Sequence, residues 1–275
     1  MRMRGFTLME LIVVIVILGI VGGISTRFLS QTVGLYNDSA MQQQRIAESR
    51  FVLERLSREI AGIHPFSLRD PLSHDAAYQG KCIEYIRISA VGSYLNSASG
   101  NSTLTLIDLP TDQLQAATVT AVSVGRRLSI RTQSASPLYS NTDSTTVKSI
   151  QSVNTAGPSV TFNSVFGANS NGYRYVVLDS TGPTAWCLFN NQLYRFQGYN
   201  SAYTFNYSGS WFMQNIANTT YSSLMAEHLQ SQSTFGIVSA SLARNAALNV
   251  SLVFSIDHDN NGLAFNRQMQ VNYVP

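Results

Sequence analysis

The chain opens with Met1-Arg-Met-Arg-Gly-Phe-Thr-Leu-Met-Glu10 and continues with Leu11-Ile-Val-Val-Ile-Val-Ile-Leu-Gly-Ile-Val-Gly-Gly-Ile24. Between Phe6 and Ile24 the sole ionisable side chain is that of Glu10. As an α-helix this stretch would be about 28 Å long, close to the hydrocarbon thickness of a bilayer. The arginines before it favour a cytoplasmic position for the short N-terminal tip. We therefore expect residues 6–27 to form a transmembrane helix.

Glu10 is the unusual residue of this stretch. A carboxylate in a membrane helix costs about 2.5–3.5 kcal/mol on insertion scales, so it calls for a cation. Cleavage of the chain after Gly5 would create an α-amino group on Phe6, four positions before Glu10. That ammonium could pair with Glu10 of its own chain or of a neighbouring copy in a helical stack. Pairing between copies would drive assembly and set its register.

The run Gly5-Phe6-Thr7-Leu8-Met9-Glu10 resembles the prepilin cleavage and methylation motif of type IV pilins and type II secretion pseudopilins. The resemblance implies that residues 1–5 are a leader removed by a prepilin peptidase and that Phe6 is then N-methylated. It also implies that assembly depends on Glu10, which matches the fifth residue of the mature chain. The motif is specific, but it covers only the N-terminal segment.

Two other interpretations of the segment stay open. One is an ordinary secretory signal peptide, with Gly22, Gly23 and Ser25 as its cleavage region. A glutamate at the start of the apolar core argues against it. The other is a plain signal anchor in which Glu10 reaches toward the membrane interface.

Residues 28–64 are expected to continue the helix with an amphipathic pattern. Its apolar stripe, which we expect to pack on a β-sheet of the same chain, consists of Ile46, Ser49, Leu53, Leu56, Ile60 and Ile63. The more polar faces carry Arg45, Glu48, Arg55, Arg58 and Glu59. A coiled coil is the weaker alternative because the pattern is short. Gly62 and the His64-Pro65 pair predict the end of the helix, and Gly22-Gly23 predicts local bending in an assembled filament.

From Lys81 onward the pattern changes to a period of two, which is typical of β-strands. The predicted strands are Cys82–Ser89, Thr103–Leu109, Thr118–Ser123, Leu128–Arg131, Ser159–Phe162, Tyr173–Leu178, Ala185–Phe189, Gln192–Gln197, Asn249–Ile256 and Phe265–Tyr273. Asn190-Asn191 and Asn261-Gly262 predict tight hairpins. A short helix is expected around Leu224–Leu229. The predicted fold class is α+β, with one long helix packed on a large antiparallel β-rich head spanning residues 65–275.

The two cysteines, Cys82 and Cys187, lie far apart in the sequence. In an exported protein they favour one disulfide, and two unpaired buried thiols are the alternative. Eight aromatic residues, beginning with Trp186, lie close together, and we expect most of the stretch to form core and cross-strand contacts rather than an exposed binding surface. They are Trp186, Phe189, Tyr194, Phe196, Tyr199, Tyr203, Phe205 and Tyr207.

No motif of enzymatic chemistry is present in the sequence. The four histidines are scattered, and neither a nucleophile elbow nor a phosphate-binding loop occurs. We therefore predict that the chain is not an enzyme and needs no cofactor. Loss of two leader arginines from 18 basic residues would leave 16 against 15 acidic ones, so no nucleic-acid partner is predicted.

One stretch partly fits a calcium loop. Asp257, Asp259 and Asn261 stand at positions 1, 3 and 5, and Gly262 at position 6, of the EF-hand pattern. Position 12 is Gln268 rather than a glutamate, and strands rather than helices are predicted on both sides. A hairpin turn is thus the favoured interpretation, and a calcium site the weaker one.

The large loop-rich head and the C-terminal sequence resemble the minor pilins of mannose-sensitive haemagglutinin (MSHA) pili, and the order of segments is also similar to the J-type pseudopilins. The resemblance implies a low-copy subunit that primes or caps a filament, with a cytoplasmic leader and a periplasmic head before assembly and a place in a surface pilus afterwards. Its expected partners are other major and minor pilins, the prepilin peptidase, the inner-membrane assembly machinery and the lipid bilayer. A pilus-borne adhesin with a glycan-binding head is a further alternative.

Overall fold

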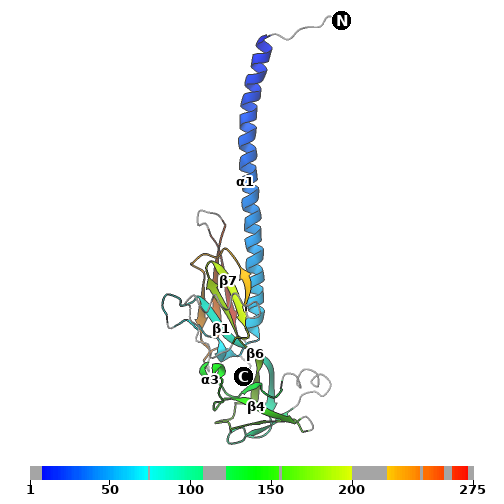
Figure 1. Cartoon of the computed structure of the whole chain (residues 1–275), viewed down its shortest axis with the longest axis vertical. Helices are drawn as coiled ribbons and strands as arrows, with labels where there is room; N and C mark the ends of the chain where they lie inside the picture. Colours follow the sequence, from blue (N-terminus) through cyan, green and yellow to red (C-terminus); the bar gives the residue numbers. More distant parts are fainter. Residues whose placement is uncertain are drawn as a thin grey trace.

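One long helix projects from a β-rich head in the computed structural model (Figure 1). The structure describes residues 8–73, 75–107, 122–154, 157–199, 222–241, 244–256 and 262–271. Helix α1 (Leu8–Ala61) is continuous over 54 residues, and only its C-terminal turns pack on the head. It ends directly before Gly62, as predicted. The α+β fold class is confirmed.

The head is built almost entirely from antiparallel strands. They are β1 (Cys82–Tyr94), β2 (Thr103–Ile107), β3 (Arg127–Ser129), β4 (Val147–Asn154), β5 (Ser159–Phe162), β6 (Arg174–Phe189), β7 (Gln192–Gln197), β8 (Ser222–Ala226), β9 (Thr234–Val238), β10 (Ala247–Ser255) and β11 (Gly262–Gln270). Two short helices, η1 (Pro65–Ser67) and α3 (Ser136–Tyr139), complete it. The strands form an eight-stranded sheet in the order β1-β2-β5-β4-β3-β6-β7-β8 and a three-stranded sheet in the order β11-β10-β9.

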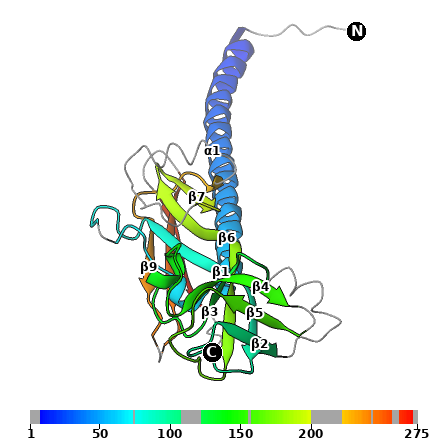
Figure 2. The same cartoon turned by 60° about the horizontal axis from the view of Figure 1, so that its bottom comes forward.

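The part of the head farthest from the free end of α1 is a small closed barrel (Figures 1 and 2). It closes because β1 also pairs with β6, which joins the two ends of the run β1-β2-β5-β4-β3-β6. Closure gives each of the barrel strands that the structure describes a partner on both sides, which protects such a lobe from edge-to-edge association. Its interior is filled by Tyr94, Ala98, Leu104, Leu106, Val122, Leu128, Ile130, Ile150, Val160, Phe162, Phe166, Tyr175 and Val177.

The part of the head nearer the membrane anchor holds the largest core. Here β1 and β6 continue beyond the barrel, β6 pairs with β7 and β7 with β8, while α1 and the β9–β11 sheet cover the same core. The strands contribute Ile83, Tyr85, Trp186, Leu188, Leu193, Met225, Phe235, Leu248, Val250, Leu252, Phe254 and Met269. This core therefore fixes the helix relative to both sheets.

A wide bulge marks the waist between the two parts. Ile86 pairs with Pro183 and Ile88 with Leu178, so the four residues between Leu178 and Pro183 lie opposite Arg87 alone. Such a bulge bends and twists the strand that carries it. The predicted strands Tyr173–Leu178 and Ala185–Phe189 are thus one strand, β6, and the prediction of two was wrong.

The other predicted elements of the head are partly confirmed and partly wrong. The predicted helix at Leu224–Leu229 is wrong, because Ser222–Ala226 is strand β8, held by pairing with β7. Strands β4 and β9 were not predicted. The Asn190-Asn191 hairpin is confirmed, with φ values of 47° and 61° that match a type I′ turn. Most of the predicted strand Thr118–Ser123 lies outside the described residues.

Candidate functional site

The N-terminal part of α1 has the length and composition of a membrane anchor. It is the one helix in the described part of the chain that could cross a membrane, with a mean hydropathy of 2.6 over 18 residues that are 0% buried. No charged side chain occurs between Glu10 and Arg27. The apolar side chains of this stretch are exposed, clear of the described part of the head, and available to lipid or to other helices.

Glu10 lies in the first turn of α1, where the helix dipole favours a negative charge. Gly5 and Phe6 lie outside the described residues, so their placement relative to Glu10 stays a prediction. Farther along, hydroxyls bond back to helix carbonyls four residues earlier, from Thr26 to Gly22 and from Thr32 to Phe28. These bonds satisfy polar groups of an apolar helix without another chain.

Exposed apolar side chains continue beyond the predicted membrane segment. Phe28, Leu29, Val33, Leu35 and Tyr36 are each more than half exposed on α1. This stretch also lies outside the head (Figure 1). A run of exposed large apolar residues on one helix is typical of a surface that contacts a membrane or other chains.

The C-terminal turns of α1 seat the helix on the head. The buried side chains are Ser49, Val52, Leu53, Leu56 and Ile60. Ile63 just beyond them is also buried. This matches the predicted apolar stripe, to which the structure adds Val52, and the partner is a β-sheet surface of the same chain. The prediction that the stripe packs within the chain is therefore confirmed.

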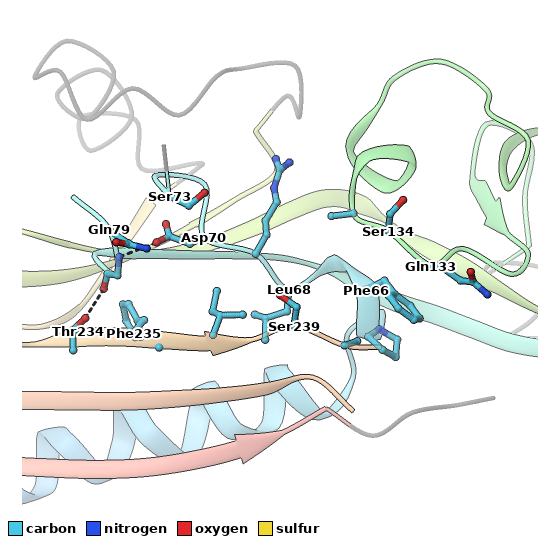
Figure 3. A pocket seen from close by; sticks show the side chains of 17 residues that line it. Phe66, Leu68, Asp70, Ser73, Gln79, Gln133, Ser134, Thr234, Phe235 and Ser239 are labelled. Carbon is cyan, nitrogen blue, oxygen red and sulfur yellow. Dashed lines mark hydrogen bonds between the residues drawn. The ribbon is translucent and has the colours of Figure 1, made fainter. Parts of the chain in front are cut away.

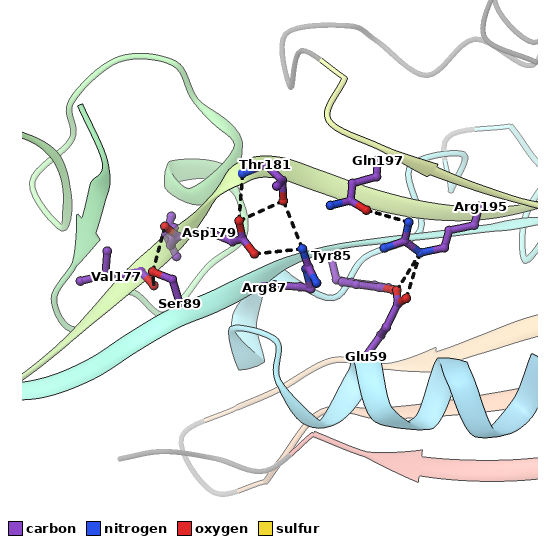
Figure 4. Close-up of polar contacts among 10 residues, drawn as sticks. Glu59, Tyr85, Arg87, Ser89, Val177, Asp179, Thr181, Arg195 and Gln197 are labelled. Carbon is purple, nitrogen blue, oxygen red and sulfur yellow. Dashed lines mark hydrogen bonds and ion pairs between the residues drawn. The ribbon is translucent and has the colours of Figure 1, made fainter. Parts of the chain in front are cut away.

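A buried polar cluster locks the end of α1 to the sheet (Figure 4). Glu59 accepts hydrogen bonds from Arg195 Nε at 2.9 and 3.0 Å and from Tyr85 Oη at 2.5 Å. Trp186 Nε1 donates to the same Tyr85 oxygen at 2.9 Å. Glu59, predicted to lie on a polar face of the helix, is instead the residue at which helix and sheet meet.

Charge balance in this cluster favours ionised Glu59. Burial opposes the charge, but the Tyr85 hydrogen bond and the Arg195 charge outweigh it, and the pKa of Glu59 is lowered. Burial and the Glu59 carboxylate raise the pKa of Tyr85 well above its usual value. Tyr85 is therefore a neutral donor and Glu59 a charged acceptor, which makes these bonds strong.

A second buried carboxylate, Glu84, anchors the chain segment that follows α1. Arg69 Nε lies 2.6 Å from Glu84 Oε2, and Tyr199 Oη donates to Oε1 at 2.7 Å. The Arg69 guanidinium also lies 3.5 Å from the centre of the Tyr139 ring. Burial raises the pKa of Glu84 despite Arg69 and Tyr199. Glu84 interrupts an apolar strand sequence, and that interruption was the available signal for a buried partner.

The predicted disulfide is present. Cys82 and Cys187 are direct partners on β1 and β6, with both side chains buried. In the aromatic stretch, Trp186, Phe196 and Tyr199 are buried, and Phe189 and Tyr194 pack against the cluster that contains Phe196 and Tyr199. Tyr203, Phe205 and Tyr207 lie outside the described residues. The core interpretation thus holds for the described members.

The described ranges hold no cluster suited to a metal ion, since no group of three His, Cys, Asp or Glu side chains there could bind one. His64 is buried, accepts from Phe66 N at 3.3 Å, and has its pKa lowered to about 4 by burial. The calcium candidates Asp257, Asp259 and Asn261 lie outside the described residues. Strand β10 precedes these residues and β11 follows them, and the two strands pair with each other from Ser255↔Gly262 to Ala247↔Gln270. The hairpin interpretation requires this pairing.

Comparison with known proteins identifies the N-terminal segment. Residues 1–26 match the family model described as a prokaryotic N-terminal methylation motif. Neither a curated protein nor a solved structure matches the chain. The match supports a type IV pilin-like prepilin, a structural class of protein, and it implies processing by a prepilin peptidase and assembly into pilus-like filaments.

Proposed function

We propose that this chain is a minor pilin of a type IV pilus, inserted into the membrane by α1 and drawn into a filament after its leader is removed behind Gly5. The observation that carries the proposal is the methylation motif at residues 1–26 running directly into an exposed apolar helix. The head sits at the opposite end of that helix, clear of the membrane segment (Figure 1). This arrangement suits a subunit whose helices bundle while its head faces outward.

Assembly in this proposal depends on charge. Cleavage would free the amino group of Phe6, and methylation would keep its positive charge. Within hydrocarbon, Glu10 of one subunit gains most by meeting that charge on a neighbour. The pairing would set the axial position of each incoming helix.

The finer assignment is to the MSHA pilus, where the resemblance is to the minor pilin MshO. The large two-part head and its disulfide support a specialised low-copy subunit that primes or caps the filament. A J-type pseudopilin of type II secretion shares the same N-terminal chemistry and differs in its partners. Co-purification with pilins, as opposed to secretion-system subunits, separates the two.

Mass spectrometry of the mature N-terminus tests the processing step. A chain that begins at Phe6 with one added methyl group supports the proposal. A chain that still begins at Met1, or begins beyond Ile24, contradicts it.

The charge model has its own test in Glu10→Ala. We expect normal membrane insertion and loss of incorporation into filaments. Asp38→Ala is the matched control, because Asp38 is an exposed carboxylate of the same helix outside the apolar stretch. Equal incorporation of both variants would refute the charge pairing.

A further inference from the structure

The bulge at the waist of the head forms part of the wall of a cavity of about 550 Å³. The bulge contributes residues 178–180, 182 and 183 to the lining of this cavity. Residues 123–127, which run into β3, and Leu138 of α3 form other parts of the lining. A cavity of this volume suits a small molecule rather than a folded domain.

Two adjacent arginines of the lining, Arg126 and Arg127, form no ion pair in the described part of the chain. Arg127 donates from its two terminal nitrogens to Leu138 O and Pro137 O at 2.7 and 2.8 Å, and these carbonyl groups are neutral. Arg126 donates from Nε to Ser123 Oγ at 3.3 Å. Both arginines are half-buried. Each guanidinium therefore loses hydration without an opposite charge beside it, which an anion in the cavity would supply.

The carboxylates near the cavity do not balance these charges. Asp179 lies in the lining, but Arg87 already neutralises it, with Arg87 Nη2 at 3.0 Å from Asp179 Oδ2 (Figure 4). The nearby Asp143 lies outside the lining and attracts both Arg127 and Lys148. The cations of this region are Arg87, Arg126, Arg127 and Lys148, and the carboxylates are those of Asp143 and Asp179. The region thus keeps an excess of positive charge, which favours an anionic ligand.

A larger cavity beside β9 lacks this excess (Figure 3). It has a volume of about 740 Å³, and the charged groups of its described lining are Arg69 and Asp70, one of each sign. Asp70 accepts a hydrogen bond from Gly80 N at 2.8 Å. Gly80 O in turn accepts from Phe235 N at 2.8 Å and from Thr234 Oγ1 at 3.2 Å, which ties the chain to the edge of β9. Charge therefore favours the cavity at the bulge, rather than the one beside β9, as an anion site.

The other side chains of the cavity at the bulge indicate what the anionic group would be attached to. Ser123, Asn141 and Ser180 present hydroxyl and amide groups, which hydrogen-bond to the hydroxyls of a ligand. Leu138 and Pro183 add small apolar surfaces, which suit the C–H groups of a ring. The planar fork of arginine matches carboxylate and phosphate groups alike. The chemistry that fits is an anionic group on a small molecule rich in hydroxyls.

We propose that this cavity binds a small anionic sugar, whose carboxylate or phosphate group is held by Arg126 and Arg127. Hydroxyls of the sugar would bond to the serine and asparagine side chains of the lining. The inference goes beyond the role proposed above and does not rest on it, because no residue of the described lining belongs to α1.

Calorimetric titration of the full-length protein in detergent tests the site. Three probes carry an anionic group, namely glucuronate, galacturonate and glucose 6-phosphate, and the neutral sugars glucose and galactose are their controls. We expect at least one anionic sugar to bind, and its neutral parent to bind at least about tenfold more weakly. The affinity should fall as salt is added, because screening weakens the attraction between charges. Comparison of glucuronate with glucose 6-phosphate shows which anionic group the arginines prefer.

Arg126→Gln removes one of the two arginine charges from the lining. The side chain of Arg126 makes one hydrogen bond within the described structure, to Ser123, whereas Arg127 also holds the end of α3. The variant Arg126→Gln is therefore expected to fold and to bind the anionic sugar at least about tenfold more weakly. Arg50→Gln is the matched control, since Arg50 is an exposed residue of α1 and its loss changes the net charge equally. This control should bind as wild type does.

The proposal is overturned if none of the three anionic sugars binds, if the neutral sugars bind equally well, or if Arg126→Gln binds as tightly as Arg50→Gln. Inorganic phosphate is the last probe. If it binds as tightly as the sugars, the cavity recognises only charge and the sugar assignment is overturned. Thermal unfolding of Arg126→Gln without ligand should match that of wild type. If it does not, the comparison of charged with neutral sugars and the salt dependence, both measured on wild type, still decide.

Discussion

Glu59 at the end of α1 and Arg195 on β7 lie 136 positions apart in the sequence, yet their Oε1 and Nε atoms are 2.9 Å apart. Both side chains are nearly buried, at 12% and 7% exposure. The same carboxylate accepts a hydrogen bond from Tyr85 on β1, so Glu59 joins the helix to two strands of the head, β1 and β7. The helix is therefore held to the head by the Glu59–Arg195 ion pair as well as by the packing of its apolar stripe.

Arg195→Met is expected to lower the free energy of unfolding by about 3 kcal/mol, because it leaves the Glu59 carboxylate buried without its cation. Urea denaturation of the detergent-solubilised chain measures the effect. Arg58→Met is the control, since Arg58 and Glu54 form an exposed pair and should cost less than about 1 kcal/mol. Adding Glu59→Gln to Arg195→Met should recover part of the loss. Equal effects of the two single variants would show that the buried pair has no special role.

Acid should destabilise the head through His64. Burial lowers the pKa of this histidine from 6.5 to about 4, so the folded state holds it neutral while the unfolded state binds a proton. The stability that this contributes is complete above pH 6.5 and is lost as the pH falls toward 4, by about 3 kcal/mol in all. Glu59, with its lowered pKa, adds a loss only at lower pH, below its ordinary value of 4.5.

His64→Gln tests this assignment, because glutamine can accept a hydrogen bond but does not titrate. Unfolding free energies measured from pH 7 to pH 4 should fall less steeply for the variant than for wild type. Identical slopes would place the acid sensitivity elsewhere in the chain.

The local features of the fold could be predicted from the sequence. The long helix follows from the apolar run and the stripe, and the Asn190-Asn191 hairpin follows from residues that tolerate positive φ. The disulfide follows from two cysteines in a chain whose N-terminal segment predicts export. The helix and the hairpin depend on short stretches of sequence. The disulfide could be predicted because two cysteines allow one intramolecular pairing only.

Features that depend on distant pairing could not be predicted. The barrel closes only because β1 pairs with both β2 and β6, and β6 stays one strand because it pairs with β1 on both sides of the bulge opposite Arg87, with a shift in register there. The stretch Leu224–Leu229 looks helical in isolation, but pairing with β7 makes its first residues part of strand β8. The buried roles of Glu59 and Glu84 likewise depend on partners more than a hundred positions away.

Loss of the disulfide should cost the head about 2–5 kcal/mol of unfolding free energy, since Cys82 and Cys187 close a loop of 105 positions. The double variant Cys82→Ala with Cys187→Ala measures this by urea denaturation. A reducing agent should destabilise wild type by a similar amount and leave the double variant unchanged. A wild-type chain that releases free thiols on denaturation without reductant would contradict the assignment.

Gly80 is expected to be intolerant of any side chain, because it brings the chain against β9. It has a φ of 75°, and a Cβ there would lie 2.5 Å from Thr234 Oγ1 and 3.0 Å from Phe235 O. Gly100 has a φ of 76° but nothing within 4 Å of its Cβ position, so it is a matched control for backbone strain alone. Gly100→Ala should cost about 1 kcal/mol, and Gly80→Ala at least about 1 kcal/mol more, as measured by urea denaturation. The bond from Phe235 N should also break in Gly80→Ala, so hydrogen exchange at that amide should become faster than in Gly100→Ala. Equal costs and equal exchange would mean that the contact between Gly80 and β9 does not hold the strand edge.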